Sequence, residues 1–477
     1  MIKHFDTYFL DANKALEEAK NNNKVIGQNP RITFDQICYY NAEEELENAP
    51  TNCIYVPFEN VYNYFITTKN RRPEKLNYDN TDISKEERKE LTTSFTAILK
   101  LVEQEREALA QLYKEQIQNY KPNFNDEKLR VLIPANKNST VMRHISKNVA
   151  KAFEQTGKYE VCYLIQEDDM QDMDYLIYYH KVDEFKPHIT FNINHMNNEF
   201  LNEYVYNFIW FQDAVPVLID DNEIYSRKND YFFHLTEGIG ELLKKKNIKS
   251  DYQSFLIDQD IYMQRDNIER EDKIIFIGSS YYSSFKNINN KYKEAILDII
   301  KKEFFKHGQI NKNLKTQLVK IFKIPFIELN HIINYVQRDI ALEYLSDNLE
   351  YPIEIYGYDF EYSEKISAKY KGIIEYGEEI SKTYNSSKYA IVLGGYALQQ
   401  RTLEALASGC TPLILNTTNS HKEDAGLEKD LIFFNKIQDL PKLIENAPYK
   451  NTNSLLKQKN YSHLIEKIEC IIKRELN

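Results

Sequence analysis

Apolar positions divide the chain into stretches of different periodicity. Residues 1–127 read as mostly helical, and the clearest helix begins at Ser84, which forms a capping-box pattern with Glu87. One face of this helix is marked at helical spacing by Leu91, Phe95, Ile98, Val102, Leu109 and Leu112. Its other face is strongly charged, so we interpret it as an arm for packing or oligomerisation.

After a break at residues 122–126, short apolar runs alternate with amphipathic segments. Within residues 128–260 the pattern predicts helices at 141–155 and 175–185, and strands at 130–134, 159–165, 188–194, 208–211 and 231–235. Short apolar strands that alternate with helices are typical of a parallel sheet with helices on both faces. This part of the chain therefore predicts a first Rossmann-like domain.

The same alternation restarts in residues 261–477. It predicts strands at 273–278, 353–357, 372–376, 389–393, 411–415 and 431–434, a helical insertion at 287–346 and a C-terminal helix at 455–476. We therefore expect an α/β chain with two Rossmann-like domains and a helical N-terminal extension.

Composition limits the function classes. A chain of 477 residues favours two or three domains, and its net charge of −11 argues against a nucleic-acid partner. The five cysteines are scattered without a CxxC pair, which favours reduced thiols in a cytoplasmic protein. The charged N-terminus and the lack of a run of about 18 apolar residues argue against a signal peptide and a membrane span.

Residues 394–414 carry the richest local pattern: strand end, glycine turn, helix, glycine stop and strand. Gly394 and Gly395 allow a tight turn and a close approach of a ligand to the backbone. The helix that follows offers free N–H groups to an anion. On that helix Arg401 and Glu404 share a face, and Gly409 stands where a helix C-cap is expected.

This pairing suits a nucleotide sugar, because the guanidinium of Arg401 can meet a diphosphate and the carboxylate of Glu404 can accept from ribose hydroxyls. The alternative is an ion pair on the helix surface. Such a pair contributes only about 0.3–0.5 kcal/mol, and Arg before Glu is its less favourable order. With glycines on both sides, the pattern favours a ligand site.

The segment at 401–409, Arg-x-x-Glu-Ala-Leu-Ala-x-Gly, resembles the donor site of GT-B nucleotide-sugar glycosyltransferases, especially the CgeB-like (spore maturation type) group. Residues 277–280, Ile-Gly-Ser-Ser, resemble the first strand and turn of the donor domain. Residues 354–357 and 372–379 resemble sequence motifs that follow later in that domain. The resemblance covers about residues 130–450. It implies transfer of a sugar from a nucleotide diphosphate donor to an unidentified protein, glycan or small-molecule acceptor.

The resemblance also implies roles for residues. Glu404 would bind the ribose, Gly394 and Gly395 would cradle the diphosphate, and Gly278 and Ser279 would form the donor turn. The nucleotide sugar would be a co-substrate, with no cofactor and no required metal ion.

Two positions depart from the family pattern. Many retaining relatives carry a second glutamate where this chain has Tyr396. The turn after Gly278 lacks an arginine and leaves Lys286 as a distant substitute. Both departures leave retention and inversion of the sugar open.

Catalytic candidates lie in the first Rossmann-like domain. His195 and Asp213 each follow a predicted strand, and open α/β sheets bind their ligands at the carboxyl ends of strands. By the resemblance, His195 is a candidate general base. It is equally well explained as a cap for residues 197–198 or a partner of a backbone carbonyl.

Two Asp-x-Asp matches, at 172–174 and 258–260, resemble a metal-binding motif, but we interpret both as structural.

Two other functions stay open: a non-catalytic partner of an active transferase, and a sugar epimerase on the same scaffold. The N-terminal helices could recruit an acceptor or form an oligomer.

Overall fold

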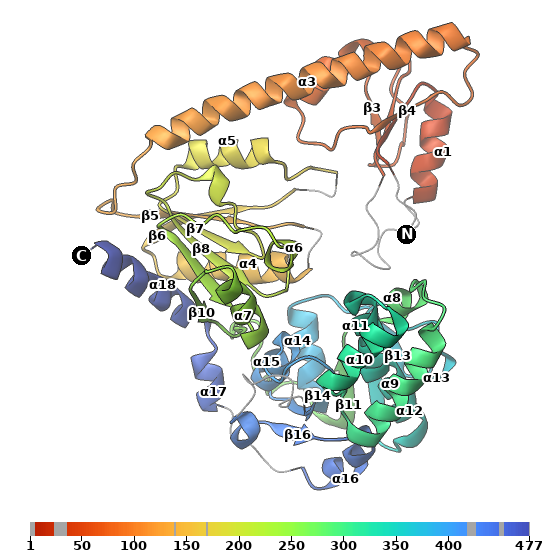
Figure 1. The fold of residues 1–477 in the computed structure, drawn as a ribbon, viewed down its shortest axis with the longest axis vertical. Coiled ribbons are helices and arrows are strands. Elements are labelled where there is room, and N and C mark those ends of the chain that lie inside the picture. The colour runs from red at the N-terminus through yellow and green to blue at the C-terminus, as the bar shows by residue number, and fades with distance from the viewer. Residues whose placement is uncertain are drawn as a thin grey trace. The chain divides into compact units, whose positions relative to one another are not determined.

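The computed structural model describes residues 5–22, 36–137, 140–167, 170–416, 426–447 and 453–476. The chain forms two compact units, Met1–Phe233 with Lys245–Ser250, and His234–Lys244 with Asp251–Asn477 (Figure 1). Residues 234–244 and 251–260, assigned by the sequence to the first Rossmann-like domain, belong to the second unit. Within the described residues, no helix combines the length and the apolar character needed to cross a membrane.

The first unit opens with a small parallel sheet of order β3-β2-β1-β4. Its strands are β1 (Thr7–Phe9), β2 (Cys38–Tyr40), β3 (Cys53–Tyr55) and β4 (Lys75–Asn77), accompanied by α1 (Ala12–Asn22) and α2 (Val61–Thr67). This sheet corrects the expectation of a mostly helical region before Ser84. Strands of three residues are too short for an alternating pattern to stand out in a sequence.

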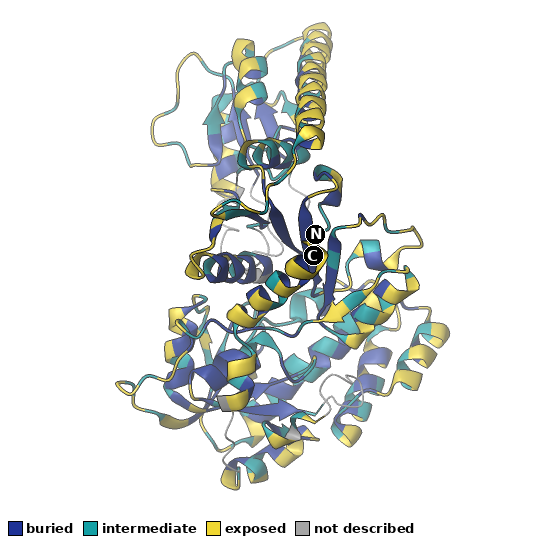
Figure 2. Ribbon diagram, turned by 90° about the vertical axis from the view of Figure 1, so that its left-hand side faces the viewer, coloured by how far each residue is buried: buried dark blue, intermediate teal, exposed yellow. Residues whose placement is uncertain are grey.

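The long helix α3 (Lys85–Asn119) begins as predicted. Ser84 accepts from the backbone N–H of Glu87 (3.2 Å), and the Ser84 N–H donates to the Glu87 carboxylate (2.7 Å), which completes the capping box. Figure 2 shows that most of the helix surface is exposed. Its buried positions are Phe95, Val102, Arg106, Ala110 and Ile117.

Leu109 and Leu112 correct the predicted apolar face, because they are 37% and 49% exposed. The first half of α3 packs on the N-terminal sheet through Phe95 and Val102. Its second half packs on α5 (Tyr175–Phe185), where Ile117 enters another core. A helix that packs on two bodies in succession need not keep one apolar face.

The second sheet has the order β10-β9-β8-β7-β5-β6. Its strands are β5 (Leu129–Pro134), β6 (Tyr159–Leu164), β7 (Ile189–Ile193), β8 (Tyr206–Phe211), β9 (Asp230–His234) and β10 (Ser250–Tyr252). Helices α4 (Thr140–Gln155), α6 (Pro216–Ile219) and α7 (Glu237–Lys245) join α5 in the connections. Strands β5 to β8 pair in parallel, and β7 and β8 are buried throughout (Figure 2).

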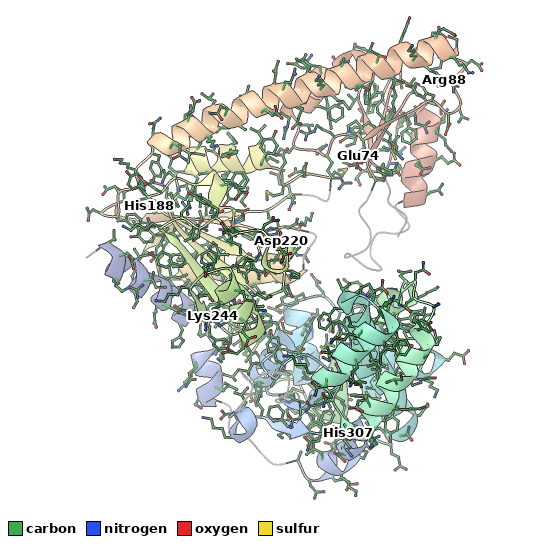
Figure 3. The ribbon with its side chains drawn as sticks, in the orientation of Figure 1. Glu74, Arg88, His188, Asp220, Lys244 and His307 are labelled. Carbon is green, nitrogen blue, oxygen red and sulfur yellow. The ribbon has the colours of Figure 1, made fainter. Side chains whose placement is uncertain are left out.

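A buried histidine ties the amino ends of β5 and β7 together. His188, labelled in Figure 3, accepts from the backbone N–H of Arg130 (3.1 Å) through Nδ1. Its Nε2 lies 3.0 Å from the carbonyl oxygen of Asn123, which accepts from it. Burial lowers the pKa of His188, so the neutral ring with its proton on Nε2 suits both contacts.

The third sheet is parallel throughout, with the order β13-β12-β11-β14-β15-β16. Its strands are β11 (Glu271–Ile277), β12 (Ile353–Tyr356), β13 (Tyr370–Gly372), β14 (Ser387–Val392), β15 (Thr411–Leu415) and β16 (Ile432–Phe434). Along the chain this order is 3-2-1-4-5-6, that of a dinucleotide-binding domain. Together with the second sheet it confirms the predicted α/β fold with two Rossmann-like domains.

The strand predicted at 372–376 is misplaced, because β13 ends at Gly372. Gly372 adopts a positive φ of 95°, and Ile373 beyond it is 47% exposed. The apolar run that follows is therefore a surface loop and not a buried strand.

Helices fill the crossover from β11 to β12, as predicted for residues 287–346. They are α9 (Lys293–His307), α10 (Lys312–Phe322), α11 (Phe326–Tyr335) and α12 (Ala341–Asn348), preceded by α8 (Tyr282–Lys286). Between α11 and α12 the helix widens into one π-helical turn, Val336–Ile340. The remaining helices are α13 (Glu364–Ser367), α14 (Glu378–Asn385), α15 (Gln400–Ala407), α16 (Leu440–Glu445), α17 (Asn453–Gln458) and α18 (Tyr461–Leu476).

Candidate functional site

The third sheet has a topological switch point between β11 and β14. The chain leaves β11 for β12 on one side and returns to β14 on the other. Crossovers diverge at such a point and leave a crevice beyond the carboxyl ends of the two strands, where open α/β sheets bind ligands. The turns that follow β11 and β14 are therefore the first place to look for a site.

The turn after β11 lies directly against the turn after β12. The Gly278 N–H donates to the Tyr356 carbonyl (3.0 Å), and the Ser280 N–H donates to the Tyr358 carbonyl (2.9 Å). Gly357 has a φ of 138°, and a Cβ there would lie 1.9 Å from the Gly278 oxygen. Only a glycine fits this approach, so the donor turn predicted at Gly278 is tightly positioned.

The π-helical turn holds the β11 turn through a buried carboxylate. Asp339 accepts from the Ser280 hydroxyl, from the Tyr281 N–H (2.9 Å) and from the Tyr362 hydroxyl (3.1 Å). Burial raises the pKa of Asp339 to about 6, although these donors oppose the shift. Single π-helical turns inside α-helices are frequent at functional sites.

Arg338 brings a cation to the same turn. Its Nη1 donates to the Ser279 carbonyl (2.8 Å), and its guanidinium carbon lies 4.5 Å from the centre of the Tyr281 ring. Its Nε is buried and has no hydrogen-bond partner among the described residues. A guanidinium with donors left over suits an anionic ligand.

Arg338 was not among the site residues predicted from the sequence. The turn after Gly278 itself lacks an arginine, and its predicted substitute, Lys286, is exposed at the end of α8. Arg338 is 59 residues away from the carbonyl that it contacts. The available signal was the pair of adjacent charges, Arg338 and Asp339, between the apolar residues Val336 and Ile340.

The glycine turn after β14 adopts the backbone that the sequence predicted. Gly394 and Gly395 have φ angles of 72° and 70°, and the Gln399 side chain donates to the Gly394 carbonyl. A Cβ on Gly394 would lie 3.7 Å from the side-chain oxygen of Gln337. The π-helical turn therefore reaches both strand ends and brings Gly278, Ser279, Gly394 and Gly395 into one region.

Arg401 and Glu404 form an ion pair on α15, with 2.8 Å between Nη1 and Oε2. The pair is not on the surface: the Glu404 side chain has no exposed area and that of Arg401 is 32% exposed. Burial by itself would lower the pKa of Arg401, but the Glu404 carboxylate and the nearby Tyr384, Tyr262 and Tyr376 together raise that pKa, so the guanidinium stays charged.

The second carboxylate oxygen of Glu404 has no partner among the described residues. In this conformation the carboxylate offers no surface to a ribose, so that role of Glu404 stays a prediction and does not support a donor site here. The side-chain amide of Gln400, in the first turn of α15, is likewise buried without a partner in the described part of the chain.

Gly409 lies at the other end of α15. The Gly409 N–H bonds to the Leu406 carbonyl (3.0 Å) and the Cys410 N–H to the Ala405 carbonyl (2.9 Å), a Schellman stop with Gly409 at a φ of 75°. This confirms the predicted helix stop. The residue precedes β15 at the amino edge of the sheet, so the structure does not bring it to the turns at the carboxyl edge.

The second sheet places His195 and Asp213 on adjacent loops. They follow β7 and β8, which pair side by side, and both residues are exposed. Asn194 joins the two loops: it donates to the Asp213 carboxylate (2.9 Å) and accepts from the Asp213 N–H (3.1 Å). Desolvation lowers the pKa of His195, and the Glu199 carboxylate opposes this shift.

Both Asp-x-Asp segments take part in local structure. Asp174 caps α5 by accepting from the Ile177 N–H (3.1 Å), and it forms an ion pair with Arg106. Asp258 accepts from the N–H of Asp260 (3.0 Å) in a turn. Across the described ranges, no three His, Cys, Asp or Glu side chains are grouped as metal ligands.

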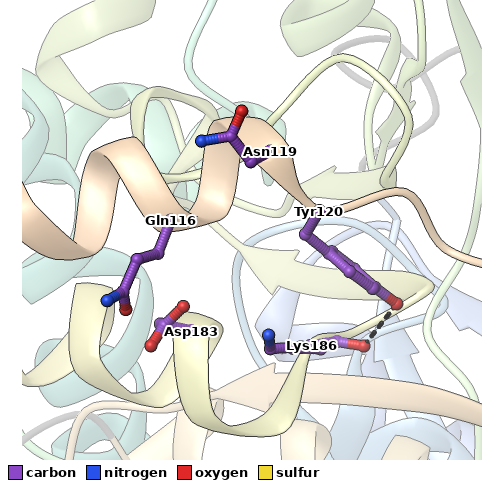
Figure 4. A pocket seen from close by; sticks show the side chains of 5 residues that line it. All are labelled: Gln116, Asn119, Tyr120, Asp183 and Lys186. Atoms are coloured by element: carbon purple, nitrogen blue, oxygen red, sulfur yellow. Dashed lines mark hydrogen bonds between the residues drawn. The ribbon is translucent and has the colours of Figure 1, made fainter.

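A surface pocket of about 410 Å³ lies elsewhere, between α3 and α5 (Figure 4). Gln116 and Asp183 face each other across it, and the Tyr120 hydroxyl donates to the Lys186 carbonyl (2.8 Å). Asn119 completes the lining. None of the predicted site residues lines this pocket, so we assign it no role in the predicted chemistry.

The sequence matches no protein-family model and no curated protein. Among solved structures, the chain is similar to a glycosyltransferase from Rickettsia africae ESF-5 (11% identity, TM-score 0.36, 67% of this chain and 88% of that one). It is also similar to the glycosyltransferase SnogD from Streptomyces nogalater (9%, TM-score 0.36, 72% and 99%). A third similar structure is S. aureus TarM in complex with Fondaparinux, alpha-GlcNAc-glycerol and UDP (12%, TM-score 0.32, 64% and 58%). TM-scores this low do not bear on the activity of this chain.

Proposed function

We propose that this protein is a glycosyltransferase that binds a nucleotide sugar at the carboxyl edge of the third sheet. The observation that carries the proposal is the switch point between β11 and β14, where the π-helical turn presents Arg338 beside two glycine turns. The sequence motifs at 277–280 and 401–409 resemble those of GT-B enzymes, especially the CgeB-like group, and we include that group in the proposal.

The proposed chemistry follows from the charge of the leaving group. The bond between the anomeric carbon and the diphosphate breaks, a bond to the acceptor oxygen forms, and the acceptor proton passes to a base. Negative charge grows on the departing diphosphate, where the Arg338 guanidinium and the backbone at Gly394 would stabilise it. Because arginine supplies this charge, we propose that the reaction needs no metal ion.

His195 is the proposed base. Its lowered pKa keeps the imidazole neutral near pH 7, as proton acceptance requires. Asp213, on the adjacent loop, is the second candidate. The acceptor, whether protein, glycan or small molecule, and the cytoplasmic location are further parts of the proposal.

Binding to a nucleotide sugar is the first test. A thermal-shift screen with UDP-, GDP-, dTDP- and CMP-sugars should find a ligand that stabilises the protein by about 2.7 kcal/mol at a hundredfold its dissociation constant. Titration calorimetry should then show affinity about ten- to hundredfold weaker in Arg338→Gln, because a charge-assisted contact is lost. The affinity of Arg338→Lys should lie between those of the wild type and Arg338→Gln, since lysine keeps the positive charge but lacks the planar guanidinium group.

Arg474→Gln is the matched control, because Arg474 is an exposed arginine of α18 that pairs with Glu475. Its affinity should equal that of the wild type. The proposal fails if no nucleotide sugar stabilises the chain, or if Arg338→Gln binds as the wild type does. Replacement of Glu404 is a poorer test, because it would leave Arg401 without its partner.

Turnover separates the remaining alternatives. Slow release of free sugar and nucleotide, reduced in His195→Ala at unchanged affinity, would support a transferase. Binding without any turnover would favour a non-catalytic partner of another transferase. Conversion of the sugar while it is still attached to the nucleotide would favour an epimerase.

A further inference from the structure

The hairpin between α10 and α11 exposes an unusual amount of apolar surface. Ile321, Phe326 and Ile327 are 68%, 59% and 66% exposed. Of the large apolar side chains in the described residues, five are at least 59% exposed, and three of these five lie within this stretch of seven residues. Single exposed apolar residues are ordinary, but a cluster of them marks an interaction surface.

The core packing of the hairpin fixes this exposure. Lys323 ends α10 in the left-handed conformation, with a φ of 49°. Leu318, Ile324 and Leu329 on either side of the turn are buried in the core of the second unit. Because these anchors face inward, the side chains between and beyond them stay outside.

A second aromatic residue extends the apolar surface. The rings of Phe322 and Tyr292 lie 5.3 Å apart, and Tyr292 is 41% exposed. The ammonium group of Lys291 lies 4.9 Å from the centre of the Tyr292 ring. We call Tyr292, Lys320, Ile321, Lys323, Phe326 and Ile327 the lysine-flanked tip.

The charge around this tip is opposite to that of the chain. Residues 286–327 contain ten lysines and three acidic residues, a net charge of +7 in a chain whose net charge is −11. Residues 311–328 contain four lysines and one acidic residue, Glu328. Lys320 and Lys323, next to the apolar side chains, are both exposed.

We propose that the lysine-flanked tip docks on an anionic lipid bilayer. Exposed isoleucine and phenylalanine side chains can enter the headgroup region, where tyrosine also prefers to lie. The lysines would attract acidic lipid headgroups. A protein partner explains the tip less well, because the cores of protein interfaces are depleted in lysine. The inference does not depend on the proposed transferase activity.

Vesicle sedimentation of the full-length protein tests this proposal. The protein should pellet with vesicles of phosphatidylglycerol and phosphatidylcholine in equal parts, and much less with pure phosphatidylcholine. The double variant Phe326→Ser/Ile327→Ser should lower the partition coefficient at least about tenfold. Lys320→Gln/Lys323→Gln should lower it about fivefold for each lysine, and added salt should weaken wild-type binding.

Leu112→Ser is the matched control, since Leu112 is 49% exposed on α3, outside the tip. It should pellet like the wild type, and all variants should keep the wild-type melting temperature. Equal binding to both vesicle types, or wild-type binding by the tip variants, would overturn the proposal. So would a dimer in the absence of vesicles that is lost in Phe326→Ser/Ile327→Ser, because a second copy would then cover the tip.

Discussion

The second and third sheets share a Rossmann-like plan but treat their polar groups differently. In the second sheet, buried amides and charges near β7, β8 and β9 bond to one another. In the third, several buried polar atoms near the strand ends have no partner among the described residues. A closed network specifies structure, whereas unsatisfied groups at a switch point favour a ligand site.

The closed network centres on Asn207 of β8. Its side-chain oxygen accepts from Thr190 (2.8 Å) and Asn192 (2.7 Å), and its nitrogen donates to the Asp230 carboxylate (3.2 Å). The Arg227 side chain donates twice to the same carboxylate, at 2.6 and 3.0 Å, and its backbone N–H donates once, at 2.7 Å. The unit as a whole is not free of such atoms: buried side-chain atoms of Gln212, Ser146 and Arg106 have no partner within the described residues.

At the third sheet, partnerless buried atoms lie next to the two turns at the switch point. They belong to Arg338 in the π-helical turn and to Gln400 in the first turn of α15. This difference leads us to place the ligand on the third sheet and to treat the network in the second as structural. Substitutions in each region should therefore affect different properties.

The largest expected effect is a loss of stability in the second sheet. Asp230→Ala removes the partner of buried Arg227 and should lower the free energy of unfolding by about 3–5 kcal/mol, measured by urea denaturation. Asp220→Ala, which removes an exposed partner of Lys246, should leave stability nearly unchanged (Figure 3). If folded Asp230→Ala bound the nucleotide sugar more weakly than the wild type, the network in the second sheet would not be purely structural.

A smaller effect concerns pH and the carboxylate under the donor turn. The pKa of Asp339 rises from 3.8 to about 6 on folding, so the folded protein holds this proton more tightly. Protonation of Asp339 therefore adds about 3 kcal/mol to the free energy of unfolding. This stabilisation is complete below pH 3.8 and is lost as pH rises through 6.

Asp339→Asn should lack this dependence. The stability of the wild type, measured against that of the variant in urea at several pH values, should therefore fall between pH 4 and pH 7. A constant difference across that range would contradict the burial of an ionisable group at this turn.

The smallest effect compares two glycines with nearly equal backbone angles. Gly394→Ala and Gly409→Ala place a side chain at φ angles of 72° and 75°, so each should lower stability by at least about 1–2 kcal/mol. Gly409→Ala should cost more, because its Cβ would lie 2.8 Å from Nη2 of Arg270. Only Gly394→Ala should also weaken nucleotide-sugar binding, measured by calorimetry, because Gly409 lies at the opposite edge of the sheet. Equal weakening by both variants would contradict this placement.

The sequence by itself determined those features that depend on neighbours along the chain. The strand at Thr411–Leu415, the capping box at Ser84 and the Gly409 helix stop agree with prediction, because periodicity, caps and stops act over a few residues. The alternation of strands and helices likewise determined the two Rossmann-like domains.

Only the tertiary structure decided which groups meet. The strand order brings Arg338 to the carbonyl of Ser279, and no local pattern encodes a contact across 59 residues. Helical spacing placed Arg401 and Glu404 on one face, but the surrounding layers decided that the glutamate is buried. Burial and partners depend on packing between distant segments, and spacing along a chain does not carry that information.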